Sequence, residues 1–188
     1  MPYATSSTGQ LTTLDACYIT FPSGSGRFIS SQGFGQKIVL NILPEISDSK
    51  SAEYALENIA GRSTPLVTYS HSSSRTISMT IHFVTCTKRD LLVNLYNLRS
   101  LESLVYPADG NQVTPYIPPP ICQLKCGSLL GDDELCVVLK SYSVKFPTDV
   151  VWDAETYLPY KFDVDTTWEV VYESTDLPGQ NRIVSVGN

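Results

Sequence analysis

The feature that most constrains the fold is the stretch from residue 160 to residue 172, which reads YKFDVDTTWEVVY. Its even-numbered positions are aromatic, aliphatic or threonine, whereas its odd-numbered positions are charged or polar except for Val171. Side chains on a β-strand alternate between two faces, so the pattern predicts a strand with one buried face and one acidic, solvent-exposed face. At about 3.3 Å per residue the strand would extend roughly 40 Å, well beyond the usual length, so it needs long partner strands.

The chain has the length and composition of one globular domain. Its 188 residues are 42% hydrophobic, which is enough for one sizeable core. We expect a flexible N-terminal extension over residues 1–13, a β domain over residues 14–175 and a loose C-terminal tail over residues 176–188. The first residues lack the basic and apolar regions of a secretory signal, and no apolar run is long enough to cross a bilayer. We therefore expect a protein made and kept in a cytoplasm.

The net charge limits the possible nucleic-acid partners. A net charge of -6 argues against a face that neutralises DNA phosphates, because such a face requires clustered Lys and Arg. An acidic conduit, past which DNA slides without binding, is compatible with this charge.

Alternating apolar and polar residues predict further strands, with the same antiparallel character. The expected ranges are 14–21, 36–43, 65–69, 75–84, 121–126 and 135–146. We expect the ranges 65–69 and 75–84 to form a hairpin around a serine-rich tip at residues 70–74. In the range 135–146 the predicted shared face is interrupted by Lys140 and comprises Cys136, Val138, Tyr142, Val144 and Phe146.

One helix is predicted from Lys88 to about Val105. Thr87 and Asp90 have the spacing of a capping box, with Asp in place of the preferred Glu. The predicted apolar stripe consists of Leu91, Leu92, Leu95, Leu98 and Leu101, and Asn94 is assigned to the outer side. Residues 47–60 are ambiguous, because their apolar residues also have helical spacing. They predict either a short helix or a loop that orders only against a neighbour. The sum is a mainly antiparallel β domain with one α-helix.

The five cysteines, Cys17, Cys86, Cys122, Cys126 and Cys136, are odd in number and have strand-like surroundings. Cys behaves as a small apolar residue, which favours buried free thiols over a metal site. A disulfide between Cys126 and Cys136 stays open as an alternative.

No catalytic or cofactor-binding set is predicted, and we expect a protein that is not an enzyme and has no metal or cofactor. His82 is expected on a polar face beside hydroxyl groups, and His71 in a loop, so neither forms a triad or a metal set. The acidic turn at residues 132–134 is expected to be a solvated hairpin tip. Asp163 and Asp165 share an open strand face with no burial to separate their pKa values, which gives an acid/base role little support.

The order of elements resembles the tube-fold proteins of contractile phage tails and related injection systems. The resemblance spans about residues 36–173. It rests on the order of the elements and on the glycine and proline residues between them, rather than on one invariant motif. The segments that carry it are Gly61-Arg62-Ser63-Thr64-Pro65, Tyr69 to Arg75 before a long strand, the helix end at Tyr106-Pro107, Pro118-Pro119-Pro120, Gly127 five residues after Cys122, and Leu158-Pro159 before the final strand.

The resemblance implies a β-sandwich or split barrel with long hairpins, in which six copies pair edge to edge around a channel for DNA. It implies a structural virion protein of a phage tail, made in the host cytoplasm, with neighbouring tube and baseplate hub proteins as partners. The glycine-rich segment at residues 23–35 and the tail beyond Glu173 favour a baseplate-proximal tube initiator or connector over the main tube subunit. The candidate channel-facing residues are Asp163, Asp165 and Glu169.

Two other classes of function stay open. The first is a monomeric β module whose polar strand face binds sugar or protein. The second is a β-rich hydrolase, which requires a carboxylate pair brought together by folding.

Overall fold

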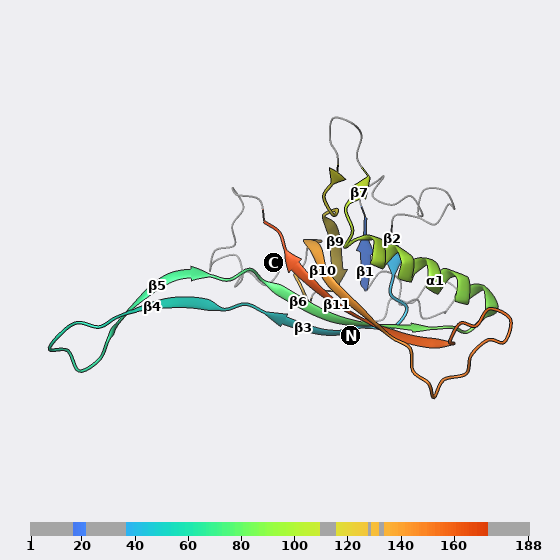
Figure 1. The fold of residues 1–188 in the computed structure, drawn as a ribbon, viewed down its shortest axis with the longest axis horizontal. Helices are drawn as coiled ribbons and strands as arrows, with labels where there is room; N and C mark the ends of the chain where they lie inside the picture. Colours follow the sequence, from blue (N-terminus) through green and yellow to red (C-terminus); the bar gives the residue numbers. More distant parts are fainter. Residues whose placement is uncertain (1–16, 22–36, 110–115, 128, 132–133, 173–188) are drawn as a thin grey trace, which may run out of the picture.

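The computed structural model describes residues 17–21, 37–109, 116–127, 129–131 and 134–172 (Figure 1). The predicted N-terminal extension, the glycine-rich segment 23–35 and the C-terminal tail lie outside the described residues. Within the described residues no helix is both long enough and apolar enough to span a membrane.

The body is built on one antiparallel seven-stranded sheet with the order β2-β1-β9-β10-β11-β6-β3. In the described part of the chain this sheet is open, with β2 and β3 at its edges, and it does not close into a barrel. The mainly antiparallel β class with one helix is thus confirmed, and the sandwich or split barrel of a tube-like fold stays a prediction. The strand bounds are β1 Cys17–Thr20, β2 Lys37–Val39, β3 Glu45–Ser49, β6 Thr76–Val84, β9 Cys122–Cys126, β10 Leu135–Lys145 and β11 Lys161–Val170.

Strand β10 joins the two halves of the sheet. Residues 135–137 pair with β9 and residues 137–145 pair with β11, so the short strands β9, β1 and β2 are reached through one end of β10. In Figure 1 these short strands run across the direction of β11, β6 and β3. The residues of both halves therefore contribute to a single hydrophobic core.

A β-bulge in β10 changes which residues face the core. The pairing with β11 shifts between Leu139 and Ser141, at Lys140. Val137 and Leu139 are buried before the bulge, and Tyr142 and Val144 pack against the core after it. One extra residue exchanges the two faces of a strand, so the prediction that Cys136 and Val138 share a face with Tyr142 and Val144 is wrong. The interruption at Lys140 that the sequence shows is this bulge.

The predicted alternation of the final strand is confirmed in β11. Phe162, Val164, Thr166, Trp168 and Val170 are buried, and the residues between them are partly exposed. The indole Nε1 of Trp168 donates a hydrogen bond to Thr166 Oγ1 at 2.8 Å, and this hydroxyl donates to the carbonyl of Met79 at 2.9 Å. The two polar groups on the core face thereby satisfy each other, which removes the penalty for burying them.

We expect Thr166→Val to lower the free energy of unfolding by about 1–3 kcal/mol, because the buried indole N–H loses its acceptor. The effect should shrink in a Trp168→Phe background, where no N–H is present. Thr167→Val, on the partly exposed face of the same strand, is the matched control. Urea denaturation measures all four variants. An equal cost of Thr166→Val in both backgrounds would contradict the hydrogen-bond explanation.

The predicted helix is α1, Lys88–Ser103, and its capping box is present. The backbone N–H of Thr87 donates to Asp90 Oδ2 at 2.8 Å, and the Thr87 hydroxyl accepts from the backbone N–H of Asp90. Two predicted positions on the helix are wrong: Leu92, assigned to the apolar stripe, is exposed, and Asn94, assigned to the outer side, is buried. Asn94 Nδ2 donates to the carbonyl of Val84 and to Thr85 Oγ1, so this amide fixes the helix to the end of β6.

Residues 47–49 and 52–57 lie in strands, so of the two alternatives for residues 47–60 the short helix is wrong. They form the end of β3 and strand β4, Ala52–Glu57, which pairs with β5, Leu66–Ser72. The predicted hairpin tip at residues 70–74 is wrong as well. Strands β5 and β6 are consecutive parts of one arm of a longer hairpin, β3 and β4 form its other arm, and the chain turns at residues 58–65. A further two-stranded ribbon joins β7, Ala108–Asp109, to β8, Tyr116–Ile117.

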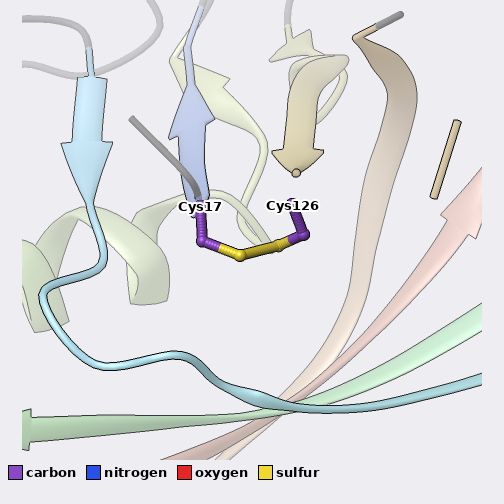
Figure 2. The surroundings of a disulfide bond; sticks show 2 residues. All are labelled: Cys17 and Cys126. Atoms are coloured by element: carbon purple, nitrogen blue, oxygen red, sulfur yellow. A yellow bond between two sulfur atoms is a disulfide. The ribbon is translucent and has the colours of Figure 1, made fainter. Parts of the chain in front are cut away.

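A disulfide joins β1 to β9. Cys17 and Cys126 are directly opposite in the antiparallel register, with Cα atoms 4.0 Å apart (Figure 2). The prediction of free thiols is wrong for this pair, and the Cys126–Cys136 alternative is wrong too. Cys122 is a buried free thiol whose pKa is raised to about 12 by burial, as predicted for a small apolar residue, whereas Cys86 and Cys136 are exposed.

Candidate functional site

The most distinctive surface belongs to a two-stranded ribbon that projects from the body. We call residues 52–72, which comprise β4, the turn and β5, the projecting hairpin. It continues the direction of β3 and β6 far beyond the end of the hydrophobic core (Figure 1). Every residue of β4 and β5 is exposed. An isolated hairpin of this kind is marginally stable in water, so its length calls for a partner.

One face of the projecting hairpin is apolar. Tyr54 is opposite Tyr69 in the register, and Leu56 is opposite Val67. Residues directly opposite one another lie on the same face, so these four side chains form one patch. The two tyrosine rings meet edge to face with centroids 5.8 Å apart, yet each of the four residues is more than half exposed. We call these four residues the hairpin patch.

The hairpin patch continues the core side of the body sheet. Ile46 and Asp48 are opposite Met79 and Ile77 in the register, which places them on the core side of β3. Successive steps of two residues lead from Asp48 through Lys50 and Ala52 to Tyr54 and Leu56. Lys50 supports this assignment, since its Nζ lies 6.0 Å from the ring centroid of Tyr172, a residue that packs against the core.

Two irregularities in the arm formed by β5 and β6 leave its core-facing side unchanged from β6 to the hairpin patch. Between the pairs Ser49↔Thr76 and Ala52↔Ser72 there are two residues on one side, 50–51, and three on the other, 73–75. A second shift, between Glu53 and Tyr54, skips Ser70. Each extra residue exchanges the faces of that strand, so two of them restore the original sides. The apolar side chains of β5 thus lie on the same side as those of β6.

Polar groups close the core where the projecting hairpin begins. Arg75 Nε lies 3.0 Å from each carboxylate oxygen of Asp48, and its Nη2 also bonds that carboxylate. The hydrogen bond with Asp48 raises the pKa of Arg75. This planar two-point contact fixes the orientation of both side chains, as is typical of Arg–carboxylate pairs.

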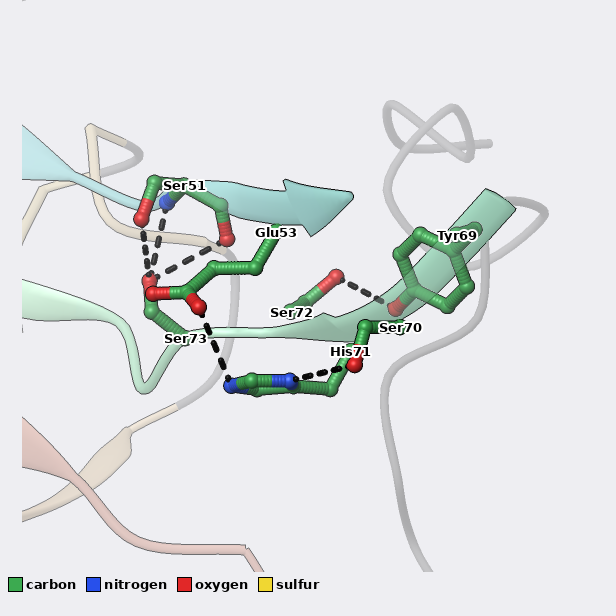
Figure 3. A network of polar contacts seen from close by, with 7 residues as sticks. All are labelled: Ser51, Glu53, Tyr69, Ser70, His71, Ser72 and Ser73. Carbon is green, nitrogen blue, oxygen red and sulfur yellow. Dashed lines mark hydrogen bonds and ion pairs between the residues drawn. The ribbon is translucent and has the colours of Figure 1, made fainter. Parts of the chain in front are cut away.

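Ser51 and Ser73 connect the two strands at the same junction (Figure 3). Ser73 Oγ accepts from the backbone N–H of Ser51 at 2.9 Å and from the Ser51 hydroxyl at 2.9 Å, and it donates to the Ser51 carbonyl at 3.1 Å. The backbone N–H of Ser73 also donates to that carbonyl. These side-chain bonds replace ladder bonds at the bulge, so they orient the projecting hairpin on the body.

The outer strands of the seven-stranded sheet and of the projecting hairpin have edges with no partner within the described residues. The outer edge of β3, both outer edges of the projecting hairpin and the outer edge of β2 pair with nothing in the described part of the chain. Unpaired edges of this length invite pairing with another chain, because their N–H and C=O groups are free to bond.

The candidate channel-facing residues lie on the outward face of β11, as the alternation predicted, but they are paired. Asp163 Oδ1 contacts His82 Nδ1 at 2.7 Å, so the prediction that His82 lies away from carboxylates is wrong. Asp165 contacts Lys145 Nζ at 2.6 Å and accepts from Thr80 Oγ1 at 2.7 Å.

Glu169 contacts Lys140 Nζ at 2.6 Å. Both lysines come from β10, beside β11. The predicted acidity of this face is therefore offset by basic residues of the neighbouring strand.

These ion pairs shift the affinity of the carboxylates for protons. The hydrogen bond from Lys145, with a smaller contribution from Thr80, lowers the pKa of Asp165 below its ordinary value of 3.8, and the same contact raises the pKa of Lys145. The hydrogen bond from Lys140 lowers the pKa of Glu169 in the same way. A carboxylate with a lowered pKa in the folded state stabilises the protein only while it is ionised.

We expect Asp165→Asn to reduce stability near neutral pH and to have a progressively smaller effect in acid. The stabilisation by Asp165 is fully present above its ordinary, unfolded pKa of 3.8 and is lost as the pH falls through the lower folded pKa. Urea denaturation at a series of pH values measures the difference. Asp149→Asn is the control, since Asp149 has no side-chain partner within the described residues. A constant difference at all pH values would contradict the ion-pair account.

The other candidate sites do not come together. Within the described residues no group of three or more His, Cys, Asp or Glu is placed to hold a metal ion. Asp132 and Asp133 lie outside the described residues, and Glu134 Oε1 accepts from the Tyr18 hydroxyl at 2.5 Å. His71 Nε2 lies 4.0 Å from Glu53 on the polar side of the projecting hairpin.

A cavity of about 450 Å³ lies between residues 37–42, the end of β6 and α1. Its lining combines apolar residues, such as Phe21 and Phe83, with His82, Asp90 and Asn97. Asp90 is already bonded in the helix cap and His82 is bonded to Asp163, so these groups have structural partners.

The hairpin patch was missed by sequence reasoning, although a signal was present. Tyr54 and Leu56 alternate with Glu53, Ala55 and Glu57, which is a strand period. The competing helical spacing of Ala52, Ala55, Leu56 and Ile59 obscured it.

The chain was compared with models of known protein families and with curated proteins. No family model matches it, and no curated protein matches it.

Proposed function

We propose that this protein is a ring-forming structural subunit of a contractile phage tail, located at the baseplate-proximal end of the tail tube. The observation that carries the proposal is the projecting hairpin. Its apolar patch continues the core side of the sheet, and no described residue of the same chain covers it. A surface of this kind becomes stable when another protein chain covers it.

The location of the unpaired edges favours other copies of the same chain as the partner. The hairpin patch and the free edges of the projecting hairpin lie at one end of an elongated molecule (Figure 1), so a contact with any different surface of a second copy is heterologous. Heterologous contacts form rings when the rotation between copies closes, and filaments when it does not. A closed ring also removes the hazard of exposed strand edges.

The number of copies and the channel follow from the resemblance to tube-fold proteins. It implies six copies around a channel through which DNA passes without specific binding. The initiator or connector role rests on the additional segments at residues 23–35 and beyond Glu173, which lie outside the described residues. The main tail tube subunit is the alternative within the same class, and a non-catalytic monomeric sugar- or protein-binding module is the alternative outside it.

Negative-stain electron microscopy of the purified chain tests the proposal. The chain is imaged alone and after addition of sheared tail particles, because a preformed tube end can nucleate assembly. We expect closed rings with a central opening in at least one of the two conditions. A chain that is monomeric in both conditions, and that binds glycans or another protein as a monomer, would contradict the proposal.

The assignment of Asp163, Asp165 and Glu169 to the channel wall stays a prediction. In particles that contain the protein, replacing all three with lysine is expected to impair DNA delivery and to leave the rings intact, because a basic wall retains phosphates. Adding Lys140→Glu and Lys145→Glu, which restores opposite charges across the same contacts, is the matched control and should recover part of the delivery. Unchanged delivery by the triple variant would exclude the assignment.

A further inference from the structure

A second apolar surface lies at the opposite end of the molecule. We call residues 146–160, the connection between β10 and β11, the distal loop, which Figure 1 draws in orange at the end away from the projecting hairpin. Val151 and Tyr157 are 73% and 78% exposed, which makes them the most exposed large apolar side chains among the described residues. Phe146 and Trp152 are exposed as well, with ring centroids 6.5 Å apart.

The distal loop is held in a fixed shape by its own hydrogen bonds. The backbone N–H of Asp153 donates to the carbonyl of Leu158 at 2.9 Å, and that of Tyr160 donates to Val151 at 3.0 Å. The buried carboxylate of Asp153 accepts from the backbone N–H and the hydroxyl of Thr156.

Tyr157 has a φ of 54°, which is an uncommon conformation for a residue with a side chain. Its N–H donates to the carbonyl of Asp153 at 2.9 Å, which closes the turn. The loop thus buries the Asp153 carboxylate and presents its apolar side chains to solvent in a preorganised form, which lowers the entropy cost of binding.

We propose that the hairpin patch of one copy docks on the distal loop of the next copy. This inference rests on the proposed self-assembly and names its two contacting surfaces. The two surfaces lie at opposite ends of the long axis, so one copy cannot satisfy itself and each contact requires a second copy. Both surfaces are rich in aromatic residues, which are enriched in the buried centres of protein interfaces.

The tip of the projecting hairpin is opposite in charge to the distal loop, whereas Glu53 and Glu57 of β4 alternate with the patch residues and lie on the other face of the hairpin. Arg62 is the one charged residue in the turn of the projecting hairpin at residues 58–65, whereas the distal loop at residues 146–160 carries Asp149, Asp153 and Glu155 and no basic residue. Asp149 has no side-chain partner within the described residues, and Glu155 is held by an exposed Lys88 at 2.9 Å. A basic tip entering an acidic, apolar loop fixes the register of the contact.

Disulfide cross-linking between two differently tagged variants tests the contact. Both carry Cys86→Ser and Cys136→Ser, which remove the exposed native thiols. One adds Leu56→Cys in the hairpin patch and the other adds Tyr157→Cys in the distal loop. Mixed assembly under mild oxidation is expected to give a covalent dimer that contains both tags.

The control mixture pairs Leu56→Cys with Leu92→Cys, an exposed leucine on α1. It is expected to give at least tenfold less mixed dimer. Equal yields from the two mixtures, or rings without any dimer from the first mixture, would overturn the docking inference while leaving ring formation intact. Absence of any assembly would overturn the proposed function and this inference together.

A charge exchange gives a second readout that needs no cysteine. Arg62→Glu is expected to weaken assembly several-fold, and Asp149→Arg in the same chain is expected to restore it, because the opposite charges meet again. Equal assembly of the single and double variants would contradict the proposed register.

Discussion

Replacing the four residues of the hairpin patch, Tyr54, Leu56, Val67 and Tyr69, with serine is expected to abolish ring formation and to leave the monomer folded. All four side chains are more than half exposed in the isolated chain, so their removal leaves no cavity in the core. In an assembled ring each would contribute about 1.5 kcal/mol or more on burial, so their loss weakens each contact by about four orders of magnitude.

Sedimentation velocity measures the assembly, and thermal unfolding followed by circular dichroism measures the fold. The matched control replaces three exposed leucines outside the hairpin patch and the distal loop, Leu43, Leu92 and Leu129, with serine. Equal loss of assembly in this control would show that general surface hydrophobicity, and not the hairpin patch, drives association. Rings formed by the four-serine variant would contradict the assembly role of the hairpin.

Trp168→Ala is expected to have the largest effect on stability, lowering the free energy of unfolding by about 3–5 kcal/mol. Trp168 is completely buried on the core face of β11, and its removal leaves a cavity in the shared core and takes one hydrogen-bond donor away from the Thr166 hydroxyl. Because whole domains are stable by only about 5–15 kcal/mol, the variant should be close to unfolding at ambient temperature.

Trp152→Ala is the matched control, since Trp152 is the second tryptophan of the chain and is 44% exposed in the distal loop. It is expected to change stability by less than about 1 kcal/mol. Urea denaturation followed by far-ultraviolet circular dichroism measures both variants. Similar costs for the two substitutions would contradict the assignment of β11 as the centre of the core.

The sequence predicted best where one face of an element is buried. The alternation from Phe162 to Val170 was sufficient, because a buried face selects apolar residues at every second position. The cap at Thr87 and Asp90 was predictable for a different reason: the interaction is local and joins residues only three positions apart. In both cases the physical determinant lies within the element itself.

The projecting hairpin was not predictable in this way. In β4 both faces are exposed, so no core sorts its residues, and a short run with two periodicities does not choose between helix and strand. The two extra residues near Ser70 and Ser73 also change the alternation without any strong local signal, in contrast to the bulge at Lys140, where a charged residue interrupts the apolar pattern.

The candidate site was predicted in position and missed in environment. Asp163, Asp165 and Glu169 do lie on the outward face of β11, because that follows from alternation alone. Their partners Lys140 and Lys145 depend on which strand lies beside β11 and on its register, and neither is encoded within the final strand. The sequence of one strand therefore gives the charge of each of its own residues, but not the net charge of a surface to which neighbouring strands also contribute.

The bond between Cys17 and Cys126 has a mechanical consequence. Strand β1 has only four residues, so its hydrogen bonds to β9 could be peeled apart one at a time by tension on the chain that precedes it. The covalent link lies at the first residue of β1, where such tension arrives, and passes the load directly to β9 in the interior of the sheet. Oxidised protein should therefore resist pulling from its N-terminal side until the body itself gives way, whereas reduced protein should release β1 first.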